Sequence, residues 1–297
     1  MYKDKKVIVV TPAGRRRYLE ILIPYLCNQR DIVDEWHIWL NTKIEEDIVY
    51  IKRLKNDFIK VIEHPYDDEK SLQIEAEART KYDPNGGCRN LPIFNIGKFL
   101  SLAPNDKNLI YVRIDDDICF IEENAISNLV KFRYDNPGYF LVYGNIINNL
   151  RLDYFHQNLC HKFIGLQPMK NAQEDYICYD WGAVIALHQE FISDLTSGKV
   201  QEYFFEDIEL KNCEYTSIQC ISYFANDVYD LYHSLSVPEI EWEENALCCT
   251  YPLKVGKINA ICGNAIVCHF SNLFTREGLE KHSDLLDIYK ELSLKMK

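Results

Sequence analysis

No part of the chain is apolar over the length that a membrane span requires. A spanning helix needs about 20 consecutive apolar residues, and the 297-residue sequence has no such run. The N-terminal stretch MYKDKKVIVVTPAG is basic and then apolar, but its apolar part is only residues 7–10. That part is too short for a secretory signal peptide and predicts a first β-strand instead. We therefore expect a cytoplasmic protein whose contact with a membrane, at its inner face, is at most peripheral.

Basic residues are too few and too scattered for a nucleic-acid-binding surface. The chain has 33 Lys and Arg against 45 Asp and Glu, which gives a formal net charge of −12. Loose electrostatic binding to a phosphate backbone needs the opposite sign, gathered in a basic stripe. We expect no nucleic-acid partner.

Cysteine spacing and short motifs exclude further classes. The eleven cysteines are odd in number and irregularly spaced, and no C-x-x-C occurs. Reduced, buried thiols in a cytosolic protein fit this pattern better than a disulfide framework. The patterns G-x-x-x-x-G-K-[ST], G-x-S-x-G and G-x-G-x-x-G are absent too, so P-loop, hydrolase and dinucleotide-binding hypotheses lose their strongest support.

The first third of the chain alternates strand and helix patterns. Apolar runs at residues 7–10, 36–40 and 58–62 are separated by helical patterns at 18–26 and 45–55. This alternation predicts an α/β fold with a mainly parallel sheet flanked by helices. Ligands bind at the carboxyl ends of such strands, where residues 11–17 and Asn41 would lie.

Later segments extend the predicted sheet. We expect strands at residues 109–114, 139–143, 184–187 and 265–270, a helical segment ending at Leu102, a short helix after 238–242 and a final helix from Ser283. No linker, repeat or low-complexity tract divides the chain, so we expect one domain over residues 1–297 with an embellished C-terminal half.

Three consecutive carboxylates interrupt an apolar run in YVRIDDDICFI (residues 111–121). Asp115, Asp116 and Asp117 repel one another, and a cation would neutralise them. Mg²⁺ and Mn²⁺ typically take one or two protein carboxylates and complete their coordination with water and substrate phosphates. The alternative is that the three residues decorate a loop or cap a helix, since Glu122 and Glu123 follow at a plausible helix start. Their place directly after a buried strand favours the metal.

The ordered set of motifs is similar to that of GT-A-fold, metal-dependent glycosyltransferases. VIVVTPAGRR resembles their nucleotide-binding first strand and loop, CRNLPIFNIGKFLS the helix before the metal strand, and IYVRIDDDI the D-x-D strand itself. VYGNIINN (residues 142–149) resembles a segment that follows this strand. The resemblance implies a GT-A-like, Rossmann-type fold with a nucleotide-sugar-binding half (1–150) and an acceptor-binding half (151–297).

The resemblance also implies a metal centre for Mn²⁺ or Mg²⁺. Carried over, Asp117 is the direct ligand, while Asp115 contacts the ribose or a metal-bound water. A late histidine completes the shell, and His269 at the end of AIVCHF stands in that place, with His156 and His161 as rivals. Asp116 leaves open which two aspartates act.

Other residues are candidates for binding the nucleotide-sugar donor, for binding the acceptor or for acting as the general base. Arg15, Arg16 and Arg17 oppose a helix dipole at its start, which favours phosphate binding over a solvated first turn. PEIEWEENAL (residues 238–247) offers Glu243 or Glu244 as a general base, and helix capping beside a core Trp is the alternative. The donor-binding candidates are Thr11, Pro12, Ala13, Arg15, Arg17, Asn41, Arg89, Lys98, Asp115 and Asp116. The acceptor-binding candidates are Trp242 and Asp180, and Glu206, Asp207 and Asp180 are the alternative bases.

We therefore expect a glycosyltransferase that moves a sugar from a nucleotide-diphosphate donor, a UDP-sugar first, to a carbohydrate or lipid-linked glycan acceptor. Surface polysaccharide or glycan synthesis is the expected setting. The alternatives are a metal-dependent nucleotidyltransferase and a non-catalytic carbohydrate- or nucleotide-binding module.

Overall fold

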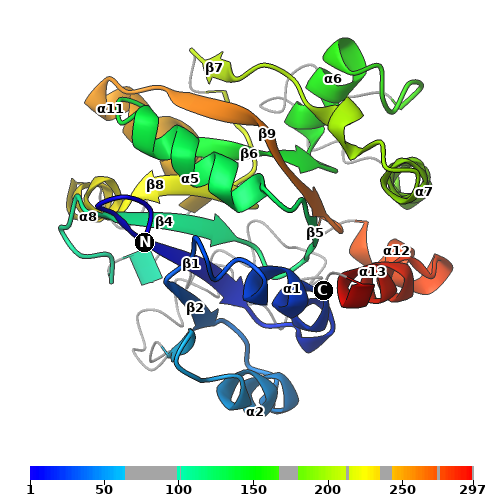
Figure 1. The fold of residues 1–297 in the computed structure, drawn as a ribbon, viewed down its shortest axis with the longest axis horizontal. Coiled ribbons are helices and arrows are strands. Elements are labelled where there is room, and N and C mark those ends of the chain that lie inside the picture. The colour runs from blue at the N-terminus through cyan, green and yellow to red at the C-terminus, as the bar shows by residue number, and fades with distance from the viewer. Residues whose placement is uncertain are drawn as a thin grey trace, which may run out of the picture.

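One nine-stranded sheet runs through the chain (Figure 1). The computed structural model describes residues 1–63, 99–100, 102–166, 180–211, 214–234, 243–272 and 275–295. The strand order is β3-β2-β1-β4-β8-β6-β9-β5, and β7 pairs with β9 beside this path. The strands are β1 (Lys6–Ala13), β2 (Glu35–Leu40), β3 (Ile59–Ile62), β4 (Leu109–Ile114), β5 (Ile118–Ile121), β6 (Val142–Ile147), β7 (Ile208–Leu210), β8 (Cys220–Phe224) and β9 (Asn259–His269).

The strand directions place six carboxyl ends on one edge of the sheet. Strands β3, β2, β1 and β4 are parallel neighbours. Strand β8 is antiparallel to both β4 and β6, and β6 is parallel to β9. Strands β1, β2, β3, β4, β6 and β9 therefore all end at the same edge, which we call the carboxyl edge. The prediction of an α/β fold with a mostly parallel sheet is confirmed.

Helices flank the sheet (Figure 1). Helix α1 packs on β5 and α13, α5 packs on β6 and β9, and α8 contacts β4 and β8. No helix in the described part of the chain is long and apolar enough to cross a membrane. The main helices are α1 (Arg16–Cys27), α2 (Glu45–Arg53), α5 (Ala125–Asp135), α6 (Leu150–Leu159), α7 (Trp181–Thr196), α8 (Ala225–Ser234), α10 (Glu243–Asn245), α11 (Tyr251–Val255), α12 (Arg276–His282) and α13 (Leu285–Lys295).

One predicted strand is wrong, and three strands were not predicted. Residues 184–187 lie within α7, where Val184, Leu187 and Phe191 are buried at helical spacing. The apolar run AVIAL was read as a strand because a short buried run has no period that distinguishes strand from helix. The antiparallel strands β5, β7 and β8 were missed, and the strand expected at 139–143 begins later, at Val142. The cysteines described are all free.

The loop after β1 approaches the loop after β2 so closely that it requires glycine. A Cβ atom on Gly14 would lie 2.6 Å from the carbonyl oxygen of Asn41, whereas one on Gly138 would meet nothing within 4 Å. We expect Gly14→Ala to lower the free energy of unfolding by about 1–3 kcal/mol, because overpacking shifts the backbone. Gly138→Ala should change it by less than about 1 kcal/mol. Urea unfolding of both variants checks this, and equal effects would contradict it.

Candidate active site

The register of two antiparallel strands brings the aspartates to His269. Asp115, Asp116 and Asp117 form the turn between β4 and β5 at the carboxyl edge. Strand β5 then runs back along β9, with Ile118 opposite His269. As a result Nε2 of His269 lies 3.4 Å from Oδ1 of Asp117. The side chains on which the metal prediction depends are therefore neighbours, although metal binding itself stays a prediction.

Three arginines from distant parts of the chain pair with the three aspartates. They come from the first loop (Arg15), from within β4 (Arg113) and from the start of α12 (Arg276). Their contacts include Arg113 Nε to Asp115 Oδ1 at 3.2 Å, Arg15 Nε to Asp116 Oδ1 at 3.0 Å, Arg15 Nη1 to Asp117 Oδ2 at 3.0 Å and Arg276 Nη2 to Asp117 Oδ2 at 3.0 Å. Guanidinium groups thus already balance the charge for which the sequence suggested a metal.

Asp116 connects the loop after β1 to the end of β4 through hydrogen bonds. It is 2% exposed, and its Oδ2 accepts hydrogen bonds from the backbone N–H of Gly14 at 2.9 Å and of Arg15 at 3.1 Å. Arg15 also donates to it through its side chain. This carboxylate is fully engaged with the loop, so the structure gives it a positioning role. Asp115 and Asp117 remain the candidates for the predicted D-x-D pair, which stays a prediction.

Asp117 and His269 form a buried ion pair. Burial alone would raise the pKa of Asp117, but Arg15, His269 and Arg276 reverse this and hold it well below its usual range. Burial would lower the pKa of His269, yet the facing Asp117 carboxylate raises it. A cation could bind here only after the imidazole loses its proton, because a protonated ring has no free lone pair.

The donor atoms at this place fit a hard divalent cation. Asp117 offers Oδ1 toward His269, while its Oδ2 accepts from Arg276. Carboxylate oxygen and imidazole nitrogen both suit Mn²⁺. Among the described residues, no third carboxylate, thiol or imidazole closes a compact group with these two. Asp115, whose side chain is 26% exposed, stands on the more open side. Water and substrate phosphates would complete the shell.

Most donor-binding candidates after β1 and β2 have structural contacts. Thr11, Pro12 and Ala13 are buried at the end of β1, and the Thr11 hydroxyl accepts a hydrogen bond from Trp36 Nε1 at 2.9 Å. Buried Asn41 donates its backbone N–H to Ala13 at 2.8 Å. These residues shape the loop, and only its backbone remains to face a ligand.

The basic residues that were predicted to bind phosphate lie in different places. Arg15 lies at the aspartates, whereas Arg17 turns away and donates to Glu280 at 2.8 Å. Arg16 is exposed and pairs with Glu20. Arg89 and Lys98 lie outside the described residues.

Glu243 belongs to the same network as the aspartates. Arg113 Nη1 lies 2.6 Å from Glu243 Oε1, and Nε of the same guanidinium contacts Asp115. Burial raises the pKa of Glu243 to about 7, although Arg113 acts in the opposite direction. Its neighbour Glu244 accepts from the hydroxyl of Tyr215 and, at 3.2 Å, from the backbone N–H of Ile218. Arg113 therefore joins Glu243 to Asp115 in one buried network.

Of the remaining candidate residues, Asp180, His156 and Asp207 form hydrogen bonds within the fold. Asp180 is the N-cap of α7 and accepts from Ala183 N–H at 2.9 Å. His156 is fully buried, with Nε2 2.6 Å from Asn145 Oδ1. Asp207 accepts from the backbone of Gly263, in the middle of β9 and away from the carboxyl edge. The other acceptor candidate, Trp242, lies outside the described residues, while Glu206 and His161 are exposed.

Sequence reasoning missed several residues of the site. Arg113 could have been found, since an arginine inside an apolar strand needs a buried partner. Asn148 has a left-handed φ of 62°, and its Nδ2 donates to the carbonyl oxygens of His269 and Phe270, both at 3.0 Å. Asn149 caps α6. Within VYGNIINN, Asn148 therefore holds the end of β9 and Asn149 fixes the start of α6. Nothing in the sequence pointed to Arg276.

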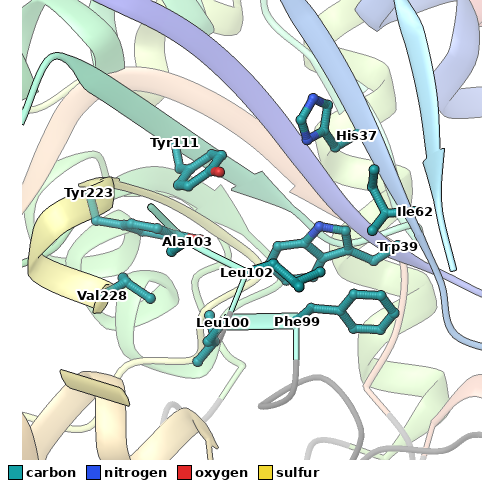
Figure 2. Close-up of a pocket in the computed structure, with 10 residues that line it drawn as sticks. All are labelled: His37, Trp39, Ile62, Phe99, Leu100, Leu102, Ala103, Tyr111, Tyr223 and Val228. Carbon is teal, nitrogen blue, oxygen red and sulfur yellow. The ribbon is translucent and has the colours of Figure 1, made fainter. Parts of the chain in front are cut away.

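An aromatic pocket lies on one face of the sheet (Figure 2). Its volume is about 160 Å³, and it is lined by His37 and Trp39 of β2, Tyr111 of β4, Tyr223 of β8 and other residues. Trp39 stacks on Phe99 with ring centroids 5.1 Å apart. None of the site carboxylates lines it, so this pocket is separate from the candidate active site.

Comparison with known proteins assigns neither a family nor an activity to the chain. No protein-family model and no curated protein matches the chain. Among solved structures, it is similar to a CMP:2-keto-3-deoxy-manno-octonic acid synthetase complexed with CTP, at 11% identity and a TM-score of 0.44, over 98% of this chain and all of that one. It is similar to a 4-diphosphocytidyl-2C-methyl-D-erythritol synthase from Anaerococcus prevotii DSM 20548, at 10% identity and a TM-score of 0.42, over 99% and 98% of the two chains. A mycobacterial protein matches at 12% identity and a TM-score of 0.40, over 99% of this chain and 74% of that one. Scores of this size carry no argument about activity.

The pKa of Glu243 predicts a pH-dependent stability. The folded protein retains this proton up to about pH 7, whereas the unfolded chain loses it near 4.5. The part of the free energy of unfolding that depends on the Glu243 proton is fully present below pH 4.5. It is lost as the pH rises through 7. In Glu243→Gln, which stays neutral, the free energy of unfolding should fall less between these values than in the wild type. Urea unfolding at several pH values measures this, with exposed Glu123→Gln as the control. Equal slopes in all three proteins would contradict the assignment.

Proposed function

We propose that the protein is a metal-dependent glycosyltransferase that acts on a nucleotide-diphosphate sugar, with a UDP-sugar as the first candidate and a carbohydrate or lipid-linked glycan as acceptor. The observation that carries the proposal is the pairing of Asp117 with His269 at the carboxyl edge, with Asp115 on its more open side. A hard cation, a nucleotide and a sugar would meet at this edge. The nucleotide would bind the half before residue 150 and the acceptor the half after it, within one domain.

The arginines suggest how a diphosphate would be bound. Arg15 and Arg276 both contact Oδ2 of Asp117. If Mn²⁺ or Mg²⁺ took their place at Asp117, the guanidinium of Arg276 and the Nη1 atom of Arg15, which stays paired with Asp116, would be released toward the phosphates that the cation also binds. Arginine donates in pairs to phosphate oxygens, so this exchange would keep every charge compensated. The cation would stabilise the negative charge that develops on the leaving diphosphate.

Nucleotidyl transfer is the second candidate, since it would use the same groups. A divalent cation at Asp117 and guanidinium groups at the phosphates suit attack on an α-phosphate as well as at a sugar carbon. The two reactions differ in their products. Nucleotidyl transfer releases pyrophosphate from a nucleoside triphosphate, whereas glycosyl transfer releases a nucleoside diphosphate from a nucleotide sugar. Chromatography of products after incubation with nucleotide sugars, or with CTP and a free sugar acid, separates them. Ligand binding without turnover in either mixture would indicate a binding module.

Removing the metal ligand should abolish nucleotide binding that depends on metal. We expect Asp117→Ala to fold, to lose transfer and to bind UDP equally with and without Mn²⁺, while His269→Gln should weaken the Mn²⁺ effect about 10–100-fold. Titration calorimetry of UDP with and without Mn²⁺ measures this. Asp31→Asn, which changes an exposed carboxylate in the turn after α1, is the control. Unchanged metal-dependent binding in Asp117→Ala would refute the assignment.

Removal of the general base should lower turnover and leave donor binding nearly unchanged. If the enzyme inverts the sugar configuration, a carboxylate must accept the proton of the acceptor hydroxyl, and we expect Glu243 or Glu244 to do so. Glu243→Gln or Glu244→Gln should lower kcat by about 10²–10⁴-fold with nearly unchanged donor affinity. Near-native turnover in both variants would place the base elsewhere. A product that retains the donor configuration would remove the need for a base at this position.

A further inference from the structure

A second group of possible metal ligands lies in the core behind the candidate active site. Cys119 of β5, Cys268 of β9 and His188 of α7 are all buried, and their ligand atoms lie within 4.8 Å of one another. The hydroxyl of Tyr289, from α13, faces the same point, 2.8 Å from His188 Nδ1 and 3.4 Å from Cys268 Sγ. These four side chains come from four elements, and no step of the proposed reaction uses them.

The spacing agrees with tetrahedral coordination. Zinc binds sulfur at about 2.3 Å and nitrogen at about 2.0–2.1 Å, so tetrahedral angles place a sulfur and a nitrogen ligand about 3.6 Å apart. Cys268 Sγ and His188 Nδ1 are 3.6 Å apart. The phenol oxygen of Tyr289, 2.8 Å from His188 Nδ1 and 3.4 Å from Cys268 Sγ, is near enough to supply a fourth ligand. Without an ion, these same atoms form a hydrogen-bonded cluster. Metal analysis distinguishes a metal site from such a cluster.

His188 is oriented as a metal ligand. Its Nε2 lies 2.8 Å from the carbonyl oxygen of Phe270, which can only accept, so Nε2 carries the proton. In the neutral ring Nδ1 then has a free lone pair, and it points toward Cys268 and Tyr289. Metal-bound histidines almost always donate their second nitrogen to a carbonyl or carboxylate in this way.

We propose that Cys119, Cys268 and His188 bind one thiophilic ion, with Tyr289 as the fourth ligand. Zn²⁺ is the ion that we expect first. Thiolate and imidazole ligands select Zn²⁺ or Cu⁺, whereas Mn²⁺ and Mg²⁺ prefer oxygen, so this site is distinct from the carboxylate site. Binding releases the two thiol protons to solvent. Successive residues of a strand face opposite sides, so an ion at Cys268 would fix the end of β9 and thereby the position of His269.

Metal analysis of the full chain tests the proposal. Protein expressed in zinc-supplemented medium and freed of loose metal by gel filtration should contain about one zinc per chain. Cys119→Ser, Cys268→Ser and His188→Gln should each lower this at least about tenfold. Cys262→Ser, a buried cysteine on the same strand outside the group, should keep its zinc, and so should Asp117→Ala. Copper bound at the same stoichiometry and lost in the same variants would support the site and identify the ion as Cu⁺.

Two results would overturn it. One is wild-type protein without bound zinc or copper after expression with either metal. The other is zinc content in Cys119→Ser and Cys268→Ser equal to that of Cys262→Ser. If the variants do not fold, cobalt-loaded wild-type protein decides: thiolate-to-cobalt charge-transfer absorption in the near ultraviolet supports the site, and its absence leaves the hydrogen-bonded cluster as the correct description.

Discussion

The burial of two of three adjacent carboxylates at the carboxyl edge is the constraint on which the rest of the site depends. Asp116 and Asp117 are each 2% exposed. Removing one partner from such a pair costs about 3–5 kcal/mol, because the charge left behind is neither paired nor hydrated. The chain meets this constraint with arginines from the first loop, from β4 and from α12. These contacts hold together segments that are far apart in sequence, so the aspartates organise the edge whether or not a metal is bound.

This pairing changes the argument for a metal. Clustered carboxylates alone suggest a cation, but here guanidinium groups already neutralise them. The stronger indication is His269, whose imidazole has no need to lie beside Asp117 for charge balance, since Arg15 and Arg276 already reach that carboxylate. A site in which arginines exchange for a cation would couple metal binding to phosphate binding. In such a site each ligand is held more tightly when the other is present.

The end of β9 connects both proposed sites. His269 faces the aspartates, and Cys268, the residue before it, faces His188 and Tyr289 in the core. Asn148 holds the same strand end from the β6 side through two side-chain hydrogen bonds. A change in either group would therefore move His269, which explains why a core cluster can matter for chemistry at the edge of the sheet.

The sequence by itself determined the fold class and predicted three carboxylates at a strand end, because these depend on local pattern, whereas the late histidine came from the family resemblance. Alternating strands and helices give a parallel sheet, and a strand followed by Asp115–Asp117 must present them at its end. The tertiary structure alone decided which groups meet. Residues 184–187 became part of α7, since a short apolar run does not choose between strand and helix without its packing partners. Asp116 is distinguished from its neighbours by the hydrogen bonds that it accepts from the backbone N–H groups of Gly14 and Arg15. Arg276 reaches Asp117 because α12 follows β9, whose register with β5 no single segment specifies. Such contacts join residues distant in sequence, and their energies depend on the assembled sheet.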